Sequence, residues 1–168
     1  EGFFLLDKHL ERLRNSARYF SFRLDEKKVV DALRERAKTF PAQPHRIRLL
    51  VARDGALRIE ARPLEDLPED MPARICLAKE PVSIQDVFLY HKTTLRDAYE
   101  RAKAARPGYD DVILWNEKGE VTESTIANLV IEQQGRFYTP PGSCGLLGGT
   151  FRAWALEQGR LEERVIRV

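Results

Sequence analysis

Cysteine and histidine are both scarce in this sequence. The two cysteines, Cys76 and Cys144, lie far apart with no CxxC spacing, and the three histidines are scattered along the chain. A disulfide framework or a metal site built on cysteine and histidine needs more of these residues, at shorter and regular spacings. We therefore predict neither a disulfide nor a metal site.

An excess of one charge is also missing. Lys and Arg together number 28 against 26 Asp and Glu, which leaves a net charge of +2. The basic residues are interspersed with acidic ones and form no stripe, whereas nucleic-acid-binding proteins carry a clustered basic surface. The composition therefore indicates no nucleic-acid partner.

Long apolar runs are absent too. No segment approaches the roughly 20 apolar residues that cross a bilayer, and the first four residues, EGFF, lack the basic region and the cleavage pattern of a signal peptide. Of the 168 residues, 43% are hydrophobic and 32% are charged, as in ordinary folded domains. We expect a cytoplasmic protein with no membrane partner, long enough for one core or two small lobes.

Two helices followed by paired strands are predicted for the first part of the chain. Apolar residues recur at helical spacing over residues 6–20 and again over 29–37, where Asp25 is a candidate N-cap. From His45 alternate residues are apolar, and Asp54-Gly55 predicts a hairpin turn into a strand at 57–61. A proline-rich, acidic connector at 63–72 then leads to a strand at 74–78.

The second part of the chain predicts a mixture of helices and short strands. One helix is expected from about residue 94 to 105, and a last helix from 150 to about 158, closed by Gly159. The strands expected in this part are 112–115, 121–123, 128–132 and 136–139. We predict an α+β (mixed α/β) fold with a small α/β lobe at 1–80, an interdomain linker at 81–91 and a larger lobe at 92–168.

Lys92 is the first residue that indicates chemistry. It follows the apolar run Phe88-Leu89-Tyr90 and precedes a predicted helix. Burial behind that run and the positive end of the helix dipole would both disfavour a charged amine. A neutral lysine amine can attack an aldehyde or abstract a proton. Most lysines are solvated surface groups, so the position alone favours that simpler role.

Glu123 and a glycine-rich segment could complete a cofactor site. A carboxylate beside the pyridine nitrogen of pyridoxal phosphate (PLP) keeps that nitrogen protonated, so the ring can accept electrons. Gly148-Gly149-Thr150 opens a predicted helix, whose free N–H groups can hold a phosphate. Taken singly, Glu123 fits better as an outward-facing strand residue paired with a nearby Lys or Arg, and many helices begin after glycine.

Arg12 lies next to the apolar stripe of the first predicted helix. From there an arginine can reach a phosphate with two hydrogen bonds, or it can be solvated like Arg14 and Arg18 on the same helix.

Neither GxGxxG nor GxxxxGK[ST] occurs in the chain, so a nucleotide site is not supported.

Three segments in this order resemble the fold-type IV, or class IV, PLP-dependent enzymes. They are HKTTLRDAYERA, GYDDVILWNEKGEVTESTIANLVIEQQGRFYTPP and GLLGGTFR, and the earlier LLDKHLERLRNSARYF resembles a helix of the family's small domain. The family includes branched-chain aminotransferase, D-amino acid aminotransferase and 4-amino-4-deoxychorismate lyase. The resemblance implies a two-lobed D-amino acid aminotransferase-like fold, PLP as cofactor in the lobe at 92–168, and a homodimer.

The resemblance also implies roles for individual residues. Lys92 matches the catalytic Schiff-base lysine, Glu123 the partner of the pyridine nitrogen, and Arg12 the arginine that binds the cofactor phosphate. The other implied cofactor-binding residues are Asn128, Leu147, Gly149, Thr150 and Phe151. In some relatives a threonine stands at the position of Phe151, so its hydroxyl contact would be missing here.

Two departures weaken the resemblance to an aminotransferase. Asp97 falls where branched-chain aminotransferases place a tyrosine near the O3′ atom of the cofactor, and Ala127 falls where they place an acidic residue. The segments FLYHKTT and CGLLGGTFR are most similar to 4-amino-4-deoxychorismate lyase, especially the lyase-like domain fused behind aminodeoxychorismate synthase component I.

That similarity implies release of pyruvate from 4-amino-4-deoxychorismate to give 4-aminobenzoate for folate synthesis. Two alternatives stay open: a class IV aminotransferase of the branched-chain or D-amino acid type, or a non-catalytic PLP-fold module of a larger synthase. The family normally has strands before Gly2, and a further phosphate-contacting turn beyond Val168. We therefore expect a chain trimmed at both ends, with lowered PLP affinity, that is fused to or works with aminodeoxychorismate synthase.

Overall fold

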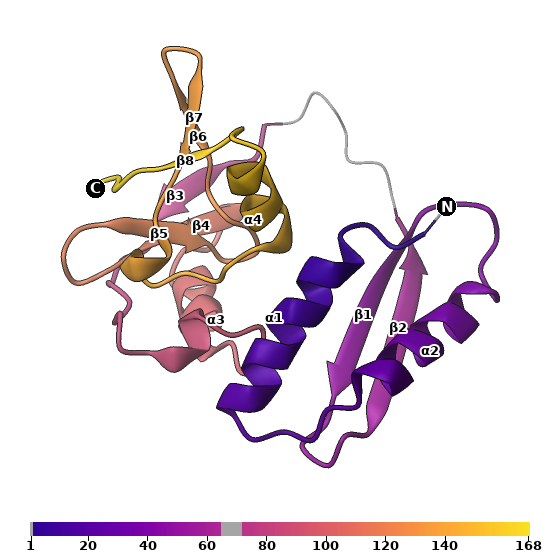
Figure 1. Cartoon of the computed structure of the whole chain (residues 1–168). Coiled ribbons are helices and arrows are strands. Elements are labelled where there is room, and N and C mark those ends of the chain that lie inside the picture. The colour runs from indigo at the N-terminus through magenta and orange to yellow at the C-terminus, as the bar shows by residue number, and fades with distance from the viewer. Residues whose placement is uncertain (1, 65–71) are drawn as a thin grey trace. The chain divides into compact units, whose positions relative to one another are not determined.

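The computed structural model describes residues 2–64 and 72–168. Contacts along the chain divide it into two compact units, Leu13–Met71 and the combination of Glu1–Arg12 with Pro72–Val168 (Figure 1). Helices and strands occur in both units, which confirms the expected mixed α/β class. The predicted connector at 63–72 falls largely outside the described residues.

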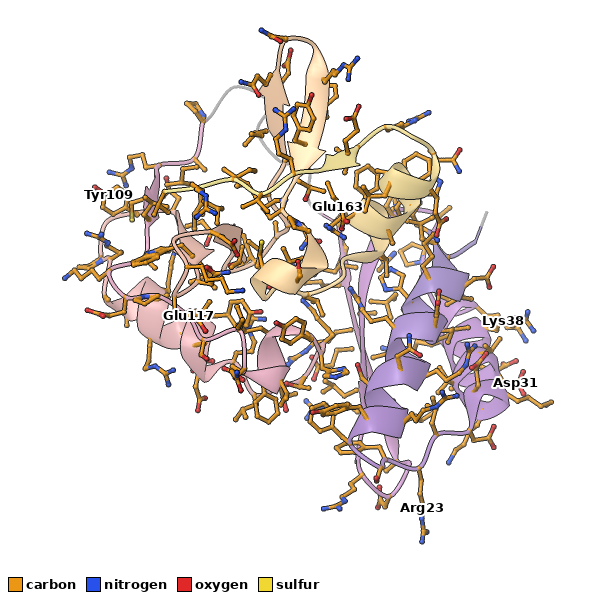
Figure 2. The ribbon with its side chains drawn as sticks, turned by 60° about the vertical axis from the view of Figure 1, so that its left-hand side comes forward. Arg23, Asp31, Lys38, Tyr109, Glu117 and Glu163 are labelled. Carbon is orange, nitrogen blue, oxygen red and sulfur yellow. The ribbon has the colours of Figure 1, made fainter. Side chains whose placement is uncertain are left out.

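The unit Leu13–Met71 contains the second part of α1 (Leu6–Tyr19), α2 (Glu26–Ala37) and an antiparallel hairpin of β1 (His45–Val51) and β2 (Leu57–Pro63). The Asp25 side chain caps α2 by accepting a hydrogen bond from the Lys28 backbone N–H at 3.0 Å. Charged side chains such as Asp31 and Lys38 extend outward from α2 (Figure 2). The predicted helix cap and hairpin are therefore confirmed.

The other unit is built on a sheet of three strands. β3 (Ile75–Leu77) runs parallel to β4 (Asp111–Trp115), which pairs antiparallel with β5 (Val121–Ser124). Next to the sheet, α3 (Asp97–Ala104) contributes Tyr99 to a buried cluster with Val112 and Leu114 of β4. This core holds β5, the strand that carries Glu123.

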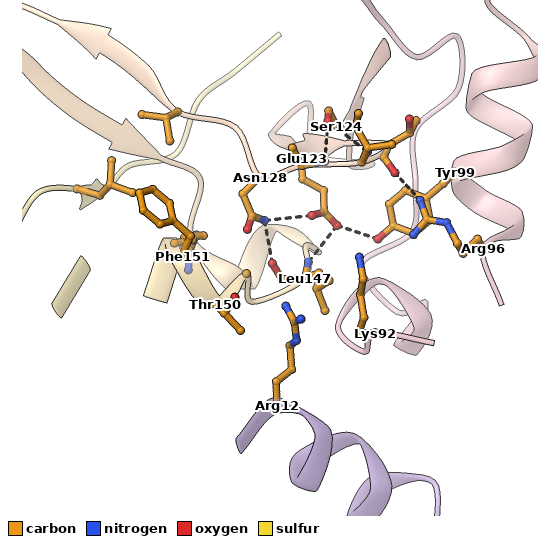
Figure 3. A pocket seen from close by; sticks show the side chains of 17 residues that line it. Arg12, Lys92, Arg96, Tyr99, Glu123, Ser124, Asn128, Leu147, Thr150 and Phe151 are labelled. Carbon is orange, nitrogen blue, oxygen red and sulfur yellow. Dashed lines mark hydrogen bonds between the residues drawn. The ribbon is translucent and has the colours of Figure 1, made fainter. Parts of the chain in front are cut away.

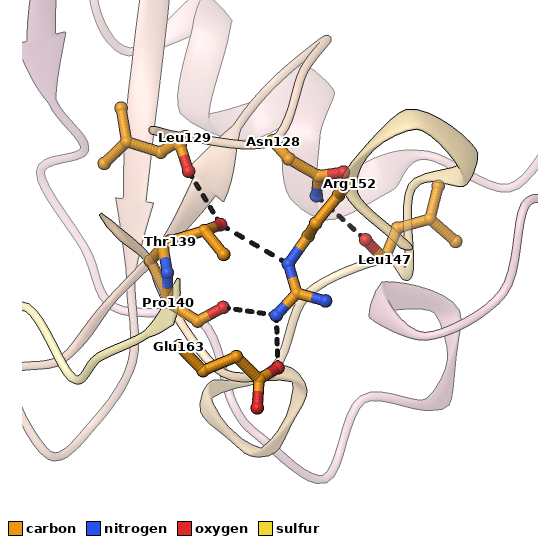
Figure 4. A network of polar contacts seen from close by, with 7 residues as sticks. All are labelled: Asn128, Leu129, Thr139, Pro140, Leu147, Arg152 and Glu163. Atoms are coloured by element: carbon orange, nitrogen blue, oxygen red, sulfur yellow. Dashed lines mark hydrogen bonds and ion pairs between the residues drawn. The ribbon is translucent and has the colours of Figure 1, made fainter. Parts of the chain in front are cut away.

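A second small sheet in this unit supports the last helix. It consists of β6 (Ile131–Gln133), β7 (Arg136–Thr139) and β8 (Glu162–Glu163), and α4 spans Thr150–Glu157. Arg152 of α4 is buried and donates hydrogen bonds to the Pro140 carbonyl at 2.8 Å and to Glu163 at 2.5 Å (Figure 4). These contacts fix the start of α4 against the sheet.

The structure divides the chain differently from the predicted lobes at 1–80 and 92–168. Because β3 pairs with β4, residues 72–80 belong with the later part of the chain. Residues 81–91, expected as a linker, contain a short 3₁₀ helix at Val87–Leu89, and Leu89 is fully buried in the core. The linker was predicted because these residues show neither helical nor strand periodicity. A compact turn can bury apolar residues without either period, so the pattern did not reveal the burial.

Two element boundaries also differ from prediction. The helix expected from about residue 94 begins at Asp97, because the Thr93 side chain accepts a hydrogen bond from the Leu95 N–H at 3.2 Å and forms a turn instead. The strand expected at 128–132 begins at Ile131.

Within residues 2–64 and 72–168, no helix is long and apolar enough to cross a membrane, and no cluster of three or more His, Cys, Asp or Glu could hold a metal ion.

Candidate functional site

A cavity of about 310 Å³ lies in the unit that contains β5 and α4. Its volume is at the lower end of the range of small-molecule sites, about 300–1,000 Å³. Every cofactor-binding and catalytic residue predicted from the sequence lines it, namely Arg12, Lys92, Glu123, Asn128, Leu147, Gly149, Thr150 and Phe151 (Figure 3). The fold thus brings together side chains from four separate segments of the sequence.

Glu123 is the buried acid of this cavity, with 4% of its surface exposed. Its Oε1 atom accepts hydrogen bonds from the Tyr99 hydroxyl at 2.7 Å and from the Leu147 backbone N–H at 3.0 Å. Its Oε2 atom accepts one from the Asn128 side chain at 3.1 Å. A carboxylate offers about four acceptor positions, so Oε2 retains one for a further donor.

The surroundings of Glu123 act on its charge in opposite directions. Burial raises the pKa of Glu123 above the ordinary value, while the hydrogen bonds from the Leu147 N–H and Tyr99, and the charge of Lys92, counteract part of this rise. Burial also raises the pKa of Tyr99. The phenol therefore stays protonated and serves as the donor to Glu123.

Asn128 links Glu123 to the glycine-rich segment. Its side-chain nitrogen donates to Glu123 and also to the Leu147 carbonyl oxygen at 2.8 Å. A Cβ atom at Gly149 would lie 1.8 Å from Asn128 Oδ1, so no side chain fits there without displacing this amide. Glycine is required at 149 because backbone and amide approach so closely.

Arg12 and the start of α4 both line the cavity and present groups of a kind that can hold an anion. The Arg12 side chain donates to the Gly148 carbonyl oxygen at 3.3 Å, and Gly149 is the N-cap of α4. The first backbone N–H groups of a helix have no partner within the helix and attract anions. The Thr150 hydroxyl lies 3.3 Å from His9 Nε2, and burial of this histidine lowers its pKa.

Lys92 lines the cavity but lies in a different setting from the one predicted. It is exposed, and it precedes α3 by a short irregular segment instead of standing at the helix start. The helix-dipole argument for a neutral amine therefore does not apply, and the expected burial of the lysine is not found, although Leu89 is itself buried in the core. Its amine points toward Tyr99 and Glu123 (Figure 3).

Arg96 and Tyr99 are cavity residues that the sequence analysis did not identify as functional. From the sequence, Tyr99 was expected only to lie within the helix from about residue 94 to 105. The spacing of three residues between Arg96 and Tyr99, which brings side chains together near a helix start, was the available signal. Asp97, expected to occupy the position near the O3′ atom, is exposed and does not line this cavity.

Comparison with known proteins shows the family to which this chain belongs. The family described as amino-transferase class IV matches residues 1–168. A protein of Schizosaccharomyces pombe described as "Putative aminodeoxychorismate lyase" is 32% identical over 166 residues, which cover 95% of this chain and 71% of that protein.

Solved structures share the fold. A "Putative amino-acid aminotransferase" from Mesorhizobium loti superposes with a TM-score of 0.90 at 34% identity, covering 99% of this chain and 81% of the other. A branched-chain amino acid aminotransferase from Thermobaculum terrenum, solved in its PLP form, gives a TM-score of 0.80 at 21% identity, covering 98% of this chain and 62% of the other. At that identity the second likeness shows the fold alone.

Proposed function

This chain belongs to the class IV aminotransferase family, and on that premise we propose that it acts as a PLP-dependent 4-amino-4-deoxychorismate lyase. The reaction releases pyruvate and leaves 4-aminobenzoate, a precursor of folate. The observation that supports PLP chemistry is the convergence of an amine, a buried carboxylate and an anion site on one cavity, formed by Lys92, Glu123 and the Arg12–α4 region. The 32% identity to the fission-yeast protein described as a putative aminodeoxychorismate lyase favours the lyase among the PLP-dependent activities.

The cavity residues fit PLP on structural grounds. Arg12 and the N–H groups at Thr150 and Phe151 would hold the phosphate, with no hydroxyl from Phe151. The remaining acceptor position on Glu123 Oε2 suits one N–H donor, as a protonated pyridine ring presents. Leu147 would pack on the ring.

When bound, PLP accepts the electron pair of a C–H bond broken next to an amine-bearing carbon. Glu123 would hold the ring nitrogen in its protonated form, which that chemistry requires. Tyr99, Asn128 and the Leu147 N–H keep the carboxylate in one orientation. Because Glu123 is committed to the ring nitrogen, the proton transfers to and from the substrate fall to another residue.

Lys92 is the residue we assign to covalent attachment and to proton transfer. Its amine would hold the cofactor covalently and, as a free amine, would remove the proton from the amine-bearing ring carbon of the substrate. Loss of the enolpyruvyl group makes the six-membered ring aromatic. A proton added to the methylene carbon of that group completes pyruvate, so atoms and charges balance.

A second function has its own support. The aminotransferase from Mesorhizobium loti is 34% identical to this chain, slightly above the 32% of the fission-yeast relative. An amino acid aminotransferase needs the same lysine and carboxylate, so these residues do not separate the two activities. The substrate does separate them: only the lyase releases pyruvate from 4-amino-4-deoxychorismate without an amino acceptor.

The cofactor and the lysine are tested together by reduction. After incubation with PLP and treatment with borohydride, we expect the peptide containing Lys92 to gain the mass of the reduced cofactor. Lys92→Ala should abolish this gain, and the exposed Lys79→Ala should keep it. A folded wild-type protein without the added mass would contradict the enzyme proposal and favour a non-catalytic module.

The substrate is tested with the PLP-loaded protein. We expect 4-amino-4-deoxychorismate to yield pyruvate and 4-aminobenzoate in equal amounts with no amino acceptor present. Transfer of an amino group from leucine or D-alanine to a 2-oxo acid, without pyruvate release from 4-amino-4-deoxychorismate, would instead support the aminotransferase.

We also propose that the chain forms a homodimer and receives its substrate from an aminodeoxychorismate synthase, either as a separate protein or as part of the same polypeptide. Large apolar side chains lie at the cavity: Ile126 is 77% exposed and Phe151 is 56% exposed. A second copy could cover them. Sedimentation equilibrium at several concentrations tests this, and a monomer throughout would contradict self-association.

A further inference from the structure

The cavity contains more basic than acidic groups. Four basic side chains line it, those of Arg12, Lys92, Arg96 and Arg152, and Glu123 is the acid among the described lining residues. Arg152 is neutralised by Glu163 at 2.5 Å. The positive charge of the other three side chains exceeds the single negative charge of Glu123. The cavity therefore suits a cofactor and a substrate that together carry several negative charges.

Arg96 is held in place without an acidic partner. It donates a hydrogen bond to the Thr125 carbonyl oxygen, and its guanidinium carbon lies 4.5 Å from the centre of the Tyr99 ring. No carboxylate in the described part of the chain forms an ion pair with it. A guanidinium has five N–H donors, so several remain for a ligand.

Thr125, whose carbonyl oxygen holds Arg96, is itself held in place by hydrogen bonds to β4. The Thr125 hydroxyl donates to the buried carboxylate of Asp111, and the Thr125 N–H donates to the Val112 carbonyl oxygen at 3.0 Å. Arg96 is therefore positioned by β4 and by the turn after β5 before any ligand arrives. A pre-positioned planar guanidinium loses little freedom when it binds a carboxylate.

Arg96 and Arg12 lie on different sides of the cavity. Arg12 is beside Thr150 at the start of α4, whereas Arg96 stacks on Tyr99 beyond Lys92 (Figure 3). If the phosphate of PLP occupies the Arg12 end, Arg96 lies near the amine that acts on the substrate. Its charge is then available to the substrate and not to the phosphate.

We propose that Arg96 binds a carboxylate of the substrate and thereby selects acidic substrates for this cavity. The proposal rests on the lyase function, whose substrate carries one carboxylate on the ring and one on the enolpyruvyl group. Arg96 would accept either carboxylate through two parallel N–H···O hydrogen bonds, as arginine does with planar anions. Tyr99 would connect this contact to Glu123, since the same residue supports Arg96 and donates to the carboxylate.

Binding of chorismate to the PLP-loaded protein tests the proposal by calorimetry. Chorismate carries both carboxylates but has no amine, so it cannot react with the cofactor. We expect Arg96→Gln to weaken chorismate binding at least about ten-fold, as loss of a charge-assisted hydrogen bond does. Arg96→Lys keeps the positive charge but lacks the two parallel N–H donors of a guanidinium, so its loss of chorismate affinity should be intermediate. Arg101→Gln, an exposed change on α3 outside this cavity, should bind as the wild type does.

The same titrations separate the possible failures. PLP affinity, measured by quenching of tryptophan fluorescence, should differ less than about two-fold between Arg96→Gln and wild type. If the wild type binds chorismate and Arg96→Gln binds it equally well, the role of Arg96 is refuted while the lyase function stands. If Arg96→Gln instead loses PLP affinity, Arg96 is a cofactor residue. If the wild type binds neither chorismate nor 4-aminobenzoate, the lyase function itself fails.

Discussion

The Tyr99 hydroxyl donates a 2.7 Å hydrogen bond to Glu123 Oε1, and both side chains are buried. This contact joins α3 to β5 across the core of the unit. It also places the aromatic ring between the Glu123 carboxylate and the Arg96 guanidinium. One tyrosine therefore orients the acid of the cavity and supports the guanidinium of Arg96.

Replacing Tyr99 by Phe should destabilise the protein by about 1–3 kcal/mol, because a buried carboxylate loses a donor while the packing is retained. Urea unfolding of the PLP-free protein measures this change. Tyr109→Phe is the matched control, since Tyr109 is 44% exposed, and it should unfold like the wild type. Equal stability of Tyr99→Phe and wild type would show that the hydrogen bond contributes nothing.

Glu123 should make stability depend on pH in a defined direction. Because its pKa is raised in the folded protein, the folded chain retains a proton that the unfolded chain releases. The contribution of this group to the free energy of unfolding therefore falls as the pH rises from the ordinary glutamate pKa through the raised value. Glu123→Gln should flatten that slope in urea unfolding of the PLP-free protein between pH 4 and about 7.

The exposed Glu132→Gln is the control for this experiment and should keep the wild-type slope. Glu123→Gln should also lower lyase turnover by about 10²-fold or more, since an amide cannot keep the pyridine nitrogen protonated. An unchanged pH slope together with unchanged turnover would contradict the role given to this carboxylate.

Adjacent glycines should respond differently to alanine. At Gly149 the new methyl group would lie 1.8 Å from Asn128 Oδ1, an amide already held by Glu123 and the Leu147 carbonyl. We expect Gly149→Ala to cost about 1–3 kcal/mol and to weaken PLP binding. At Gly148 a Cβ atom meets nothing within 4 Å, so Gly148→Ala should change both properties much less. Thermal unfolding and PLP titration of the two variants make the comparison.

The two cysteines should differ in reactivity. Cys144 is 1% exposed, and burial, with Glu120 nearby, raises the pKa of its thiol to about 11. Cys76 is only partly buried. With Ellman's reagent under native conditions we expect one thiol to react, and Cys76→Ser to remove that reaction, because the thiolate is the reactive form. Fast labelling that persists in Cys76→Ser would show that the region around Cys144 opens readily.

Local patterns were enough to predict several elements. The Asp25 cap, the Asp54-Gly55 hairpin and the last helix depend on interactions within a few residues, so the sequence predicts them directly. Among the residues that the sequence indicated, Lys92, Glu123 and Gly149-Thr150 line one cavity. These features depend on residue type and spacing, and both can be read from the sequence without a structure.

Only the tertiary structure decided which distant segments meet. The pairing of β3 with β4, and therefore the division of the chain, depends on a partner strand far along the sequence. The exposure of Lys92, the burial of Glu123 and the contacts of Tyr99 with Glu123 and Arg96 follow from how α3 and β5 pack. The sequence by itself determined which chemical groups the site contains, and packing decided which of them are buried, which are charged and which are left to bind a ligand.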